Sequence, residues 1–412
     1  MTVRKSTLMI AMSLLIAFAN IIALSAQQSP APRKLNVGDL KVRTWSKPAQ
    51  LSPQQIEAIT HNQPSLPLWS FGLTSSRDGN QYTGVVVGKD PTKPNSGETD
   101  VPTQLVPFIF VTNLIVTSIN PDGSYNTTPG QTVFDPTAID PNCLTAPNNV
   151  PLTLMQQSPI IQHTGFTFGG TFVGNTQYVD AFQRANFWNV IKQNKYHVLL
   201  EPVTTLAPII INVPAASGVA LPPTLFNNPP CGPEGEIDIG YVDSLITQVI
   251  LPALFAQGVN SATFPIFPMY NTVLSEGTPA FNNCCILGYH GFNNIQTYSP
   301  VDFQIAQVFP PTIADTAIMA HEVGEWMNDP FVFDFTPAWG HIGQVGGCQN
   351  NYEVGDPLTG TDVATVTMPN GYTYHLQELA FFNWFYGAPS VGVNGWFSNN
   401  GTFTSDAGPV CQ

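Results

Sequence analysis

Charged residues are scarce in this chain, and basic residues are the scarcest. Only 10% of its 412 residues are charged, and 13 lysines and arginines stand against 27 aspartates and glutamates. Hydrophobic residues make up 43%, so the shortage of charge excludes intrinsic disorder and favours a large packed core. The acidic balance excludes an electrostatic surface for nucleic acid, and we expect no nucleic-acid partner.

Long hydrophobic runs are also missing, except near the N-terminus. The apolar residues 8–24 follow Arg4 and Lys5 and precede small and polar residues, which is typical of a secretory signal peptide over residues 1–26. A membrane anchor is the alternative, since the run approaches spanning length. Cleavage would leave 11 basic against 27 acidic residues, a net charge of −16. No later run is predicted to span a bilayer, so we expect a secreted or periplasmic protein without an integral membrane segment.

The cysteines show no zinc-ribbon spacing, which argues against a cysteine metal site. In an exported chain, six cysteines allow three structural disulfides, whose pairing the sequence leaves open. We expect the adjacent Cys284 and Cys285 to bond elsewhere and not to each other. The six are Cys143, Cys231, Cys284, Cys285, Cys348 and Cys411.

Short β-like runs separated by Pro, Gly, Asn and Asp dominate the chain. Amphipathic helices are predicted over residues 176–191, whose aromatic stripe we interpret as a core face, and over residues 241–255, starting near Asp243 or Ser244. Residues 377–385 predict a buried helix near the C-terminus. The β-like runs occupy residues 82–87, 105–118, 124–134, 197–203, 209–213, 262–274, 285–290 and 295–301.

One stretch carries the chemistry, His321-Glu322-Val323-Gly324-Glu325. Thr312 and Asp315 indicate a capping box that opens a helix over residues 314–327, and Asn328 and Pro330 close it. Residues four apart on a helix lie on the same face, one turn apart. His321 and Glu325 are therefore predicted to project together, with Glu322 close to the same point.

This stretch resembles the H-E-x-x-H helix of zincin metallopeptidases, with Glu325 in place of the second histidine. The resemblance implies that His321 and Glu325 bind zinc and that Glu322 is the general base for hydrolysis of a polypeptide substrate. It also implies an α+β fold, in which a zincin-like mixed β-sheet carries the active-site helix. A β-rich N-terminal part and a disulfide-stapled C-terminal part would complete that fold.

Two downstream residues are candidates for the third ligand, Glu353 and His341. Glu353 and Asp356 resemble the second element of gluzincins, which implies that Asp356 holds the other ring nitrogen of His321. Two glutamates and one histidine around Zn²⁺ sum to zero charge, whereas His341 in place of one glutamate leaves +1 and acidifies a bound water more strongly. Binding by both residues would instead close the site and make the metal structural.

Two further points concern the metal and its surroundings. Oxygen-rich ligands admit Ca²⁺ or Mn²⁺ as alternatives to zinc. His290 ends a predicted strand just before the helix, and it either reaches the metal, stabilises an oxyanion or is a hydrogen-bonded strand-end histidine. His163 and His197 lie in β-like runs and are predicted to be structural.

The last third of the chain is also similar to the plant phosphate-induced, exordium-like secreted proteins, which are extracellular and linked to growth. That resemblance implies that His321, Glu325, Glu353 and Asp356 act together, without implying peptidase activity. The matching elements are Ala320-His321-Glu322, Glu325, Asn328, Pro330, Trp339-Gly340 and Glu353-Val354-Gly355-Asp356.

The predicted organisation is a signal peptide, an extended arm over residues 27–67 and one large domain over residues 68–412, divisible at residues 235 and 236. Two functions remain for this organisation. One is a secreted zinc peptidase. The other is a non-catalytic extracellular binding or structural protein that retains a degenerate zincin helix and a structural metal.

Overall fold

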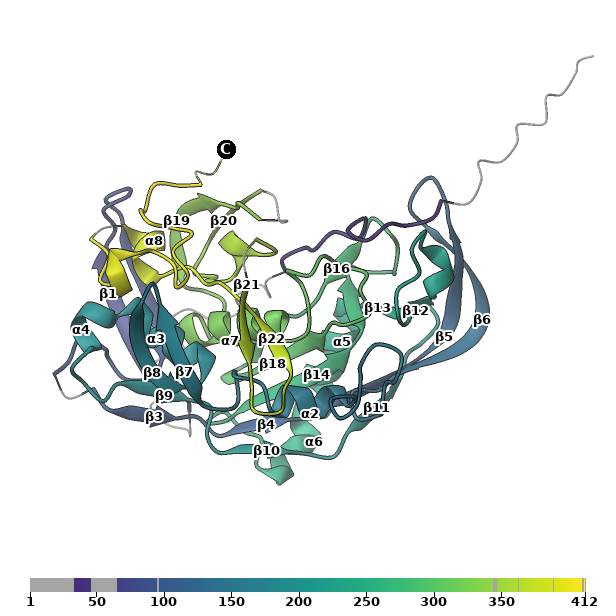
Figure 1. Ribbon diagram of the computed structural model, residues 1–412, viewed down its shortest axis with the longest axis horizontal. Coiled ribbons are helices and arrows are strands. Elements are labelled where there is room, and N and C mark those ends of the chain that lie inside the picture. Colours follow the sequence, from purple (N-terminus) through teal and green to yellow (C-terminus); the bar gives the residue numbers. More distant parts are fainter. Residues whose placement is uncertain are drawn as a thin grey trace, which may run out of the picture. The chain divides into compact units, whose positions relative to one another are not determined.

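The computed structural model describes residues 33–45, 65–94, 96–343, 347–361, 363–387, 389–409 and 411. The predicted signal peptide and residues 27–32 and 46–64 of the predicted arm lie outside these ranges. Strand, at about 35%, outweighs helix, at about 18%, and the strands form several sheets (Figure 1). The prediction of a mixed fold of helices and sheets is therefore confirmed.

A five-stranded sheet packs against the helix that carries the candidate site. The first four strands in its order are parallel, and β17 runs antiparallel at the edge. Every residue of β14 is buried, as expected for a strand that is covered on both faces. The order is β10 (Val203–Thr205), β4 (Thr103–Leu105), β14 (Phe264–Tyr270), β18 (Gln296–Phe303) and β17 (Gly291–Asn293).

Helix α7 (Ala317–Asn328) packs against β18 and against β22 (Thr373–Gln377). Trp326 fixes it on the sheet, because its ring stacks on Phe264 with centroids 3.6 Å apart and its Nε1 donates to Oγ1 of Thr297 at 2.9 Å. This helix carries the predicted motif.

The predicted end of α7 is confirmed, but the predicted capping box is wrong. The residue before the first turn is Thr316, and Thr312 lies outside the helix. Asp315 has a φ of 38°, and its carboxylate accepts hydrogen bonds from Nδ1 of His375 at 2.6 Å and from the backbone N–H of Thr316. Asp315 thus ties the helix start to β22, a tertiary contact that the local sequence does not show.

A second, seven-stranded sheet is mixed. Its strands pair in parallel between β11 and β5, β12 and β5, and β13 and β15, and the other pairs are antiparallel. Strand β16 ends the order at one edge. The order is β11 (Ile209–Asn212), β5 (Phe108–Ile119), β12 (Gly218–Leu221), β13 (Glu234–Asp238), β15 (Thr272–Ser275) and β16 (Cys284–Ile286), and β6 (Tyr125–Phe134) pairs with β5.

Two-stranded pairs complete the β structure. Within the described residues, 11 of the 22 strands overlap a predicted β-like run, and the runs over residues 105–118, 197–203 and 262–274 are each divided in two. The other 11 strands lie where no run is predicted. The pairs are β1 (Leu68–Thr74) with β2 (Gln81–Val87), β3 (Glu98–Asp100) with β9 (His197–Leu199), β7 (Thr164–Phe168) with β8 (Thr171–Thr176), β19 (Phe335–Gly340) with β20 (Cys348–Asn351), and β21 (Val363–Thr367) with β22.

The first predicted amphipathic helix is present as α3 (Tyr178–Asn186) and α4 (Trp188–Ile191), which are separated at Phe187. All residues of α3 are buried, which confirms the interpretation of its aromatic stripe as core. The only other short α-helix before it is α2 (Pro151–Gln156) among the residues described.

The second predicted helix is a continuous helical stretch over Ile239–Gln257, made of α5 (Ile239–Leu245), a π-helical turn (Ile246–Ile250), α6 (Leu251–Leu254) and a short 3-10 turn. It starts earlier than predicted, because Asp238 caps it by accepting a hydrogen bond from the N–H of Gly240 at 2.9 Å.

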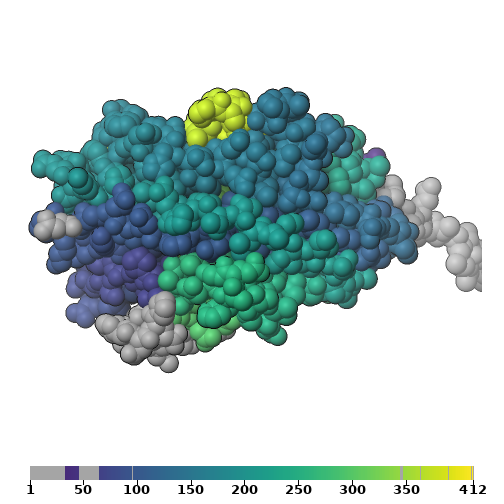
Figure 2. Space-filling model, turned by 90° about the horizontal axis from the view of Figure 1, so that it is seen from below, coloured from purple at the N-terminus to yellow at the C-terminus, as the bar shows by residue number. Residues whose placement is uncertain are grey.

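That stretch corrects the expectation that no later run is long and apolar enough to span a bilayer. Its 19 residues have a mean hydropathy of 1.5 and pass that test by length and composition. One face, with Val242, Ile246 and Ile250, is buried in the core, while Phe255 is 69% exposed. In Figure 2, atoms coloured green, which the bar gives to residues from about 250 to 300, lie at the surface of the face shown. Within this stretch, 33% of the residues are buried inside the protein.

The cysteines form Cys143–Cys231, Cys284–Cys285 and Cys348–Cys411. The expectation that adjacent cysteines bond elsewhere is wrong, because the other four pair among themselves and leave Cys284 and Cys285 buried as mutual partners. The third bridge ties down the C-terminal part, as predicted. Bonds between distant cysteines indicate an oxidising environment.

The predicted helix over residues 377–385 is mostly wrong, since only α8 (Phe382–Tyr386) is helical. Glu378 is buried and accepts hydrogen bonds from the hydroxyls of Ser398 and Thr402 and from the N–H of Asn400, which holds this segment extended. Its aromatic residues are core, as expected, with Trp384 and Phe385 fully buried.

Candidate metal centre

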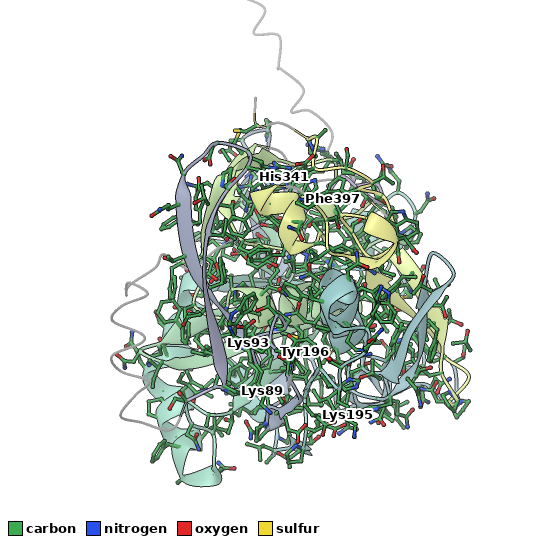
Figure 3. The ribbon with its side chains drawn as sticks, turned by 90° about the vertical axis from the view of Figure 1, so that its left-hand side faces the viewer. Lys89, Lys93, Lys195, Tyr196, His341 and Phe397 are labelled. Atoms are coloured by element: carbon green, nitrogen blue, oxygen red, sulfur yellow. A yellow bond between two sulfur atoms is a disulfide. The ribbon has the colours of Figure 1, made fainter. Side chains whose placement is uncertain are left out.

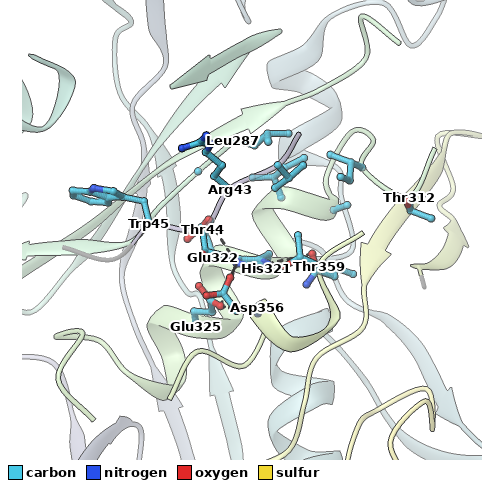
Figure 4. A pocket seen from close by; sticks show the side chains of 16 residues that line it. Arg43, Thr44, Trp45, Leu287, Thr312, His321, Glu322, Glu325, Asp356 and Thr359 are labelled. Atoms are coloured by element: carbon cyan, nitrogen blue, oxygen red, sulfur yellow. Dashed lines mark hydrogen bonds and ion pairs between the residues drawn. The ribbon is translucent and has the colours of Figure 1, made fainter. Parts of the chain in front are cut away.

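The motif residues of α7 project to one point, as helical spacing requires. Nε2 of His321 lies 3.1 Å from Oε1 of Glu325 and 4.0 Å from Oε1 of Glu322. His321 is 12% exposed at its side chain, and both glutamates are buried. The three groups form one wall of a pocket (Figure 4).

The loop after β20 closes over the helix and brings Asp356 to the same point. Oδ1 of Asp356 lies 3.5 Å from Nε2 of His321. Oε1 of Glu325 accepts hydrogen bonds from the backbone N–H groups of Gly355 and Asp356, each at 3.1 Å. A Cβ on Gly355 would lie 2.5 Å from Nδ1 of His321, so the loop approaches this closely only with glycine.

Gln377, at the end of β22, orients the His321 ring. Nδ1 of His321 donates to Oε1 of Gln377 at 3.1 Å, and Nε2 of Gln377 donates to the carbonyl of Gly355 at 2.7 Å. This tautomer leaves the lone pair of His321 Nε2 directed at Glu325 and Asp356. The role predicted for Asp356, to hold the other nitrogen of His321, thus falls to Gln377, and Asp356 lies where a ligand would.

His290 lies on the other side of Glu325, between β16 and β17. Its Nε2 donates to the carbonyl of Asp329 at 2.9 Å, and its Nδ1 faces Oε2 of Glu322 and Oε2 of Glu325, each at 3.8 Å. Burial lowers the pKa of His290 to about 4, so the ring is neutral and Nδ1 presents a lone pair to both carboxylates. Because Nε2–H is already used, His290 has no proton left for an oxyanion in this arrangement.

The two candidates for a third ligand lie apart from His321. Oε2 of Glu353 is 3.8 Å from Nε2 of His290, and its Oε1 accepts a hydrogen bond from Nδ2 of Asn351 at 2.9 Å. The ring of His341 packs at a tilt against Trp339, with ring centroids 5.0 Å apart, and its Nδ1 donates to the carbonyl of Asp356 at 3.0 Å. Glu353 therefore belongs to the His290 side, and His341 supports the loop that carries Asp356.

Two sets of side chains within the described residues can hold a metal ion, and they share Glu325. One set is His321, Glu325 and Asp356, and the other is His290, Glu322 and Glu325, with the ligand atoms of each set within 4.8 Å of one another. Two ligands of a tetrahedral zinc ion, each about 2.1 Å from the metal, lie about 3.4 Å apart. The 3.1 and 3.5 Å separations of the first set match this spacing, whereas the 3.8 Å separations of the second are wider.

The site brings together three buried carboxyl groups, and no lysine or arginine of the described residues forms an ion pair with them. Burial raises the pKa of Glu322 to about 8, and burial together with neighbouring carboxylates raises the pKa of Glu325 well above its usual range. Burial likewise raises the pKa of Asp356. In the part of the chain that is described, the ion-pair partners of these three carboxylates are histidines, with no lysine or arginine.

Figure 3 shows His341 near the top of the view and Lys89, Lys93 and Lys195 in its lower half. Lys93 pairs with Asp90 at 3.7 Å, and Lys89 donates to the carbonyl of Glu98. Because burying carboxylates without a cation is costly, the arrangement favours a bound cation or shared protons.

Among the described residues, the other histidines pair with carboxylates away from the site. His163 lies 2.7 Å from Glu201 and His197 lies 2.8 Å from the buried Asp180, which agrees with structural roles. Neither belongs to a set of possible metal ligands.

Gln377 is the residue that sequence reasoning missed. No motif spacing marks it, since β22 reaches the site only through the packing of α7 on that strand. Comparisons with protein-family models, curated proteins and solved structures found no match to this chain.

Proposed function

We propose that the chain is a secreted metal-dependent hydrolase of peptide bonds, similar in its catalytic helix to the zincin metallopeptidases. The observation that carries this proposal is the convergence of His321 Nε2, Glu325 Oε1 and Asp356 Oδ1 on one point of a pocket wall, next to Glu322. The five-stranded sheet, with its antiparallel edge strand and α7 packed against it, supports the zincin-like interpretation.

His321, Glu325 and Asp356 would hold the ion. One nitrogen and two oxygen donors suit Zn²⁺, and Mn²⁺ accepts the same donors, whereas Ca²⁺ prefers oxygen alone. A divalent cation there would supply Lewis acidity, which lowers the pKa of a water molecule and polarises a substrate carbonyl.

In this proposal, Glu322 acts first as the general base and then as the general acid. Its carboxylate lies beside His321 but farther from Nε2 than Glu325 does, so it is free to take a proton from a water in the pocket and return it to the leaving amine. Nδ1 of His290 faces Oε2 of Glu322 at 3.8 Å, beyond hydrogen-bond distance, and the hydrogen bond from Nε2 to the carbonyl of Asp329 fixes the ring.

Metal analysis and casein hydrolysis by the purified chain test the proposal. We expect about one zinc per chain, hydrolysis that a chelator abolishes, and a Glu322→Gln variant that keeps the metal but loses at least about 100-fold in rate. Glu201→Gln, which changes an exposed glutamate paired with His163, is the matched control. Undiminished hydrolysis by Glu322→Gln would contradict the assignment of the base.

A second function is a non-catalytic extracellular protein stabilised by the same metal. The charge of the site favours it, because Glu325 and Asp356 neutralise a divalent cation completely and so acidify its water less. This function predicts that chelation lowers the melting temperature while no peptide substrate is cleaved. Turnover that depends on Glu322 would rule it out.

A further inference from the structure

Residues 41–43 pair through two backbone hydrogen bonds with the edge strand of the seven-stranded sheet. The N–H of Arg43 donates to the carbonyl of Cys285 at 2.7 Å, and the N–H of Cys285 donates to the carbonyl of Lys41 at 2.9 Å. Cys285 belongs to β16, the last strand of that sheet. An edge strand offers unpaired backbone groups to any extended peptide, and here the chain's own segment takes them.

The same segment forms a wall of the pocket that contains the candidate metal centre. Residues 42–45 line it together with His321, Glu322 and Glu325. Figure 4 shows Arg43, Thr44 and Trp45 above the carboxylates of the site in that view. A peptide that reached the site along β16 would need the space that these residues fill.

Side-chain contacts hold the segment in place. The ring of Trp45 meets Tyr289 edge-on, with centroids 4.8 Å apart. Gln349 uses its Nε2 twice, donating to Oδ2 of Asp356 at 2.6 Å and to Oγ1 of Thr44 at 3.4 Å. The segment is thus linked through one side chain to a proposed metal ligand.

The residues before this segment are fixed in the core. Leu35 is fully buried and Leu40 is 1% exposed. The N–H of Leu35 donates to the carbonyl of Leu225 at 2.8 Å. By contrast, Arg43 is exposed, and its guanidinium bonds the carbonyl of Asn282 and pairs with Glu276 at 3.5 Å. Residues 35–40 can therefore stay fixed in the core while residues 41–45 leave the pocket.

We infer that residues 41–45 occupy the binding strip for an extended polypeptide, and that their displacement from β16 opens the candidate site. The inference rests on the proposed function, which it deepens by naming the binding mode of the substrate. The polypeptide would pair its backbone with Cys285, place an apolar side chain where Val42 is buried, and place an aromatic one against Tyr289.

The test uses the full chain and a fluorescent peptide with the sequence of residues 38–45. In the variant Arg43→Pro with Trp45→Ala, the proline removes the N–H that bonds Cys285 and the alanine removes the contact with Tyr289. We expect this variant to bind the peptide at least tenfold more tightly than the wild-type chain, measured by fluorescence anisotropy. Lys34→Ala, at an exposed position outside the strip, should bind like the wild type, and a peptide of scrambled sequence should not bind.

The outcomes separate this inference from the proposed function. Equal peptide binding by the variant and the wild type overturns the inference, even if both hydrolyse casein. Tighter binding by the variant without hydrolysis by either chain supports the inference, while the peptidase proposal fails. Trp45→Ala alone, which keeps the backbone bonds of the strip, gives the same comparison if the double variant does not fold.

Discussion

Nδ1 of His321 donates to Oε1 of Gln377 at 3.1 Å, and this hydrogen bond decides which ring nitrogen is offered to a metal. Gln377 is itself held by the carbonyl of Gly355, in the loop that carries Asp356. The side-chain amide of Gln377 therefore links α7, the loop that carries Asp356, and β22. Partners of this kind fix the tautomer and orientation of a metal-binding histidine.

Gln377→Leu should weaken metal binding by about 10- to 100-fold, because the His321 ring loses the acceptor that fixes its tautomer. Competition for zinc with a chelating dye measures the affinity. Gln162→Leu, at an exposed position, should leave it unchanged. An unaltered affinity in Gln377→Leu would show that the ring is oriented by other contacts.

Glu325→His should not restore a working H-E-x-x-H site. Oε1 of Glu325 accepts two backbone N–H groups, from Gly355 and Asp356, and an imidazole cannot accept both. Leaving buried donors unpaired costs about 1–3 kcal/mol each, so urea unfolding should show a clear loss of stability. Glu325→Gln keeps an acceptor oxygen and should remain more stable than Glu325→His while losing the metal. The reverse order of stability would refute this role of Glu325.

Gly355→Ala should disturb the site without touching a ligand. The added methyl group would lie 2.5 Å from Nδ1 of His321, so either the ring or the loop must move. We expect metal affinity to fall at least tenfold, and thermal unfolding to show a loss of about 1–3 kcal/mol. The control is Gly371→Ala, where the methyl group meets nothing within 4 Å and only the left-handed φ of 80° opposes alanine, whereas Gly355 has a φ of −86°. Equal metal affinity in the two variants would contradict the prediction.

The pH dependence of stability should include a contribution from Glu236, outside the metal centre. Burial raises the pKa of Glu236 to about 8, although hydrogen bonds from Tyr125 and Ala280 oppose the rise. The folded chain then holds a proton that the unfolded chain releases above its ordinary pKa of about 4.5. The stability from this group is therefore complete below about pH 4.5 and is lost as the pH rises toward 8.

Glu236→Gln removes that titration while keeping an acceptor for Ala280. Urea unfolding between pH 5 and pH 8 should show a smaller decline of stability for the variant than for the wild type. Glu276→Gln, at an exposed glutamate, provides the comparison. If the free energy of unfolding declined equally with pH in Glu236→Gln and in the wild type, Glu236 would not contribute to the pH dependence of stability.

The features predicted correctly from the sequence are those that local periodicity determines. The spacing of His321 and Glu325 defines one face of a helix wherever that helix lies, and the aromatic stripe of α3 requires a core. The failures involve tertiary partners. Asp315 binds His375 in place of forming a cap, Glu378 holds an extended segment where a helix is predicted, and neither partner is near in sequence.

The same distinction applies to the candidate site. The resemblance to gluzincins implies that Asp356 orients His321, yet the fold turns its carboxylate to Nε2 and assigns the orienting bond to Gln377. Only the backbone hydrogen bonds from the loop that carries Asp356 to Glu325 determine which of its acids faces His321.

Metal content, measured by mass spectrometry on purified full-length variants, tests the central claim most directly. The claim is that His321, Glu325 and Asp356 are the ligands. Asp356→Asn should lose the metal, while His341→Ala and Glu353→Gln should keep about one zinc per chain. Retention of the metal by Asp356→Asn together with its loss from Glu353→Gln would contradict the account.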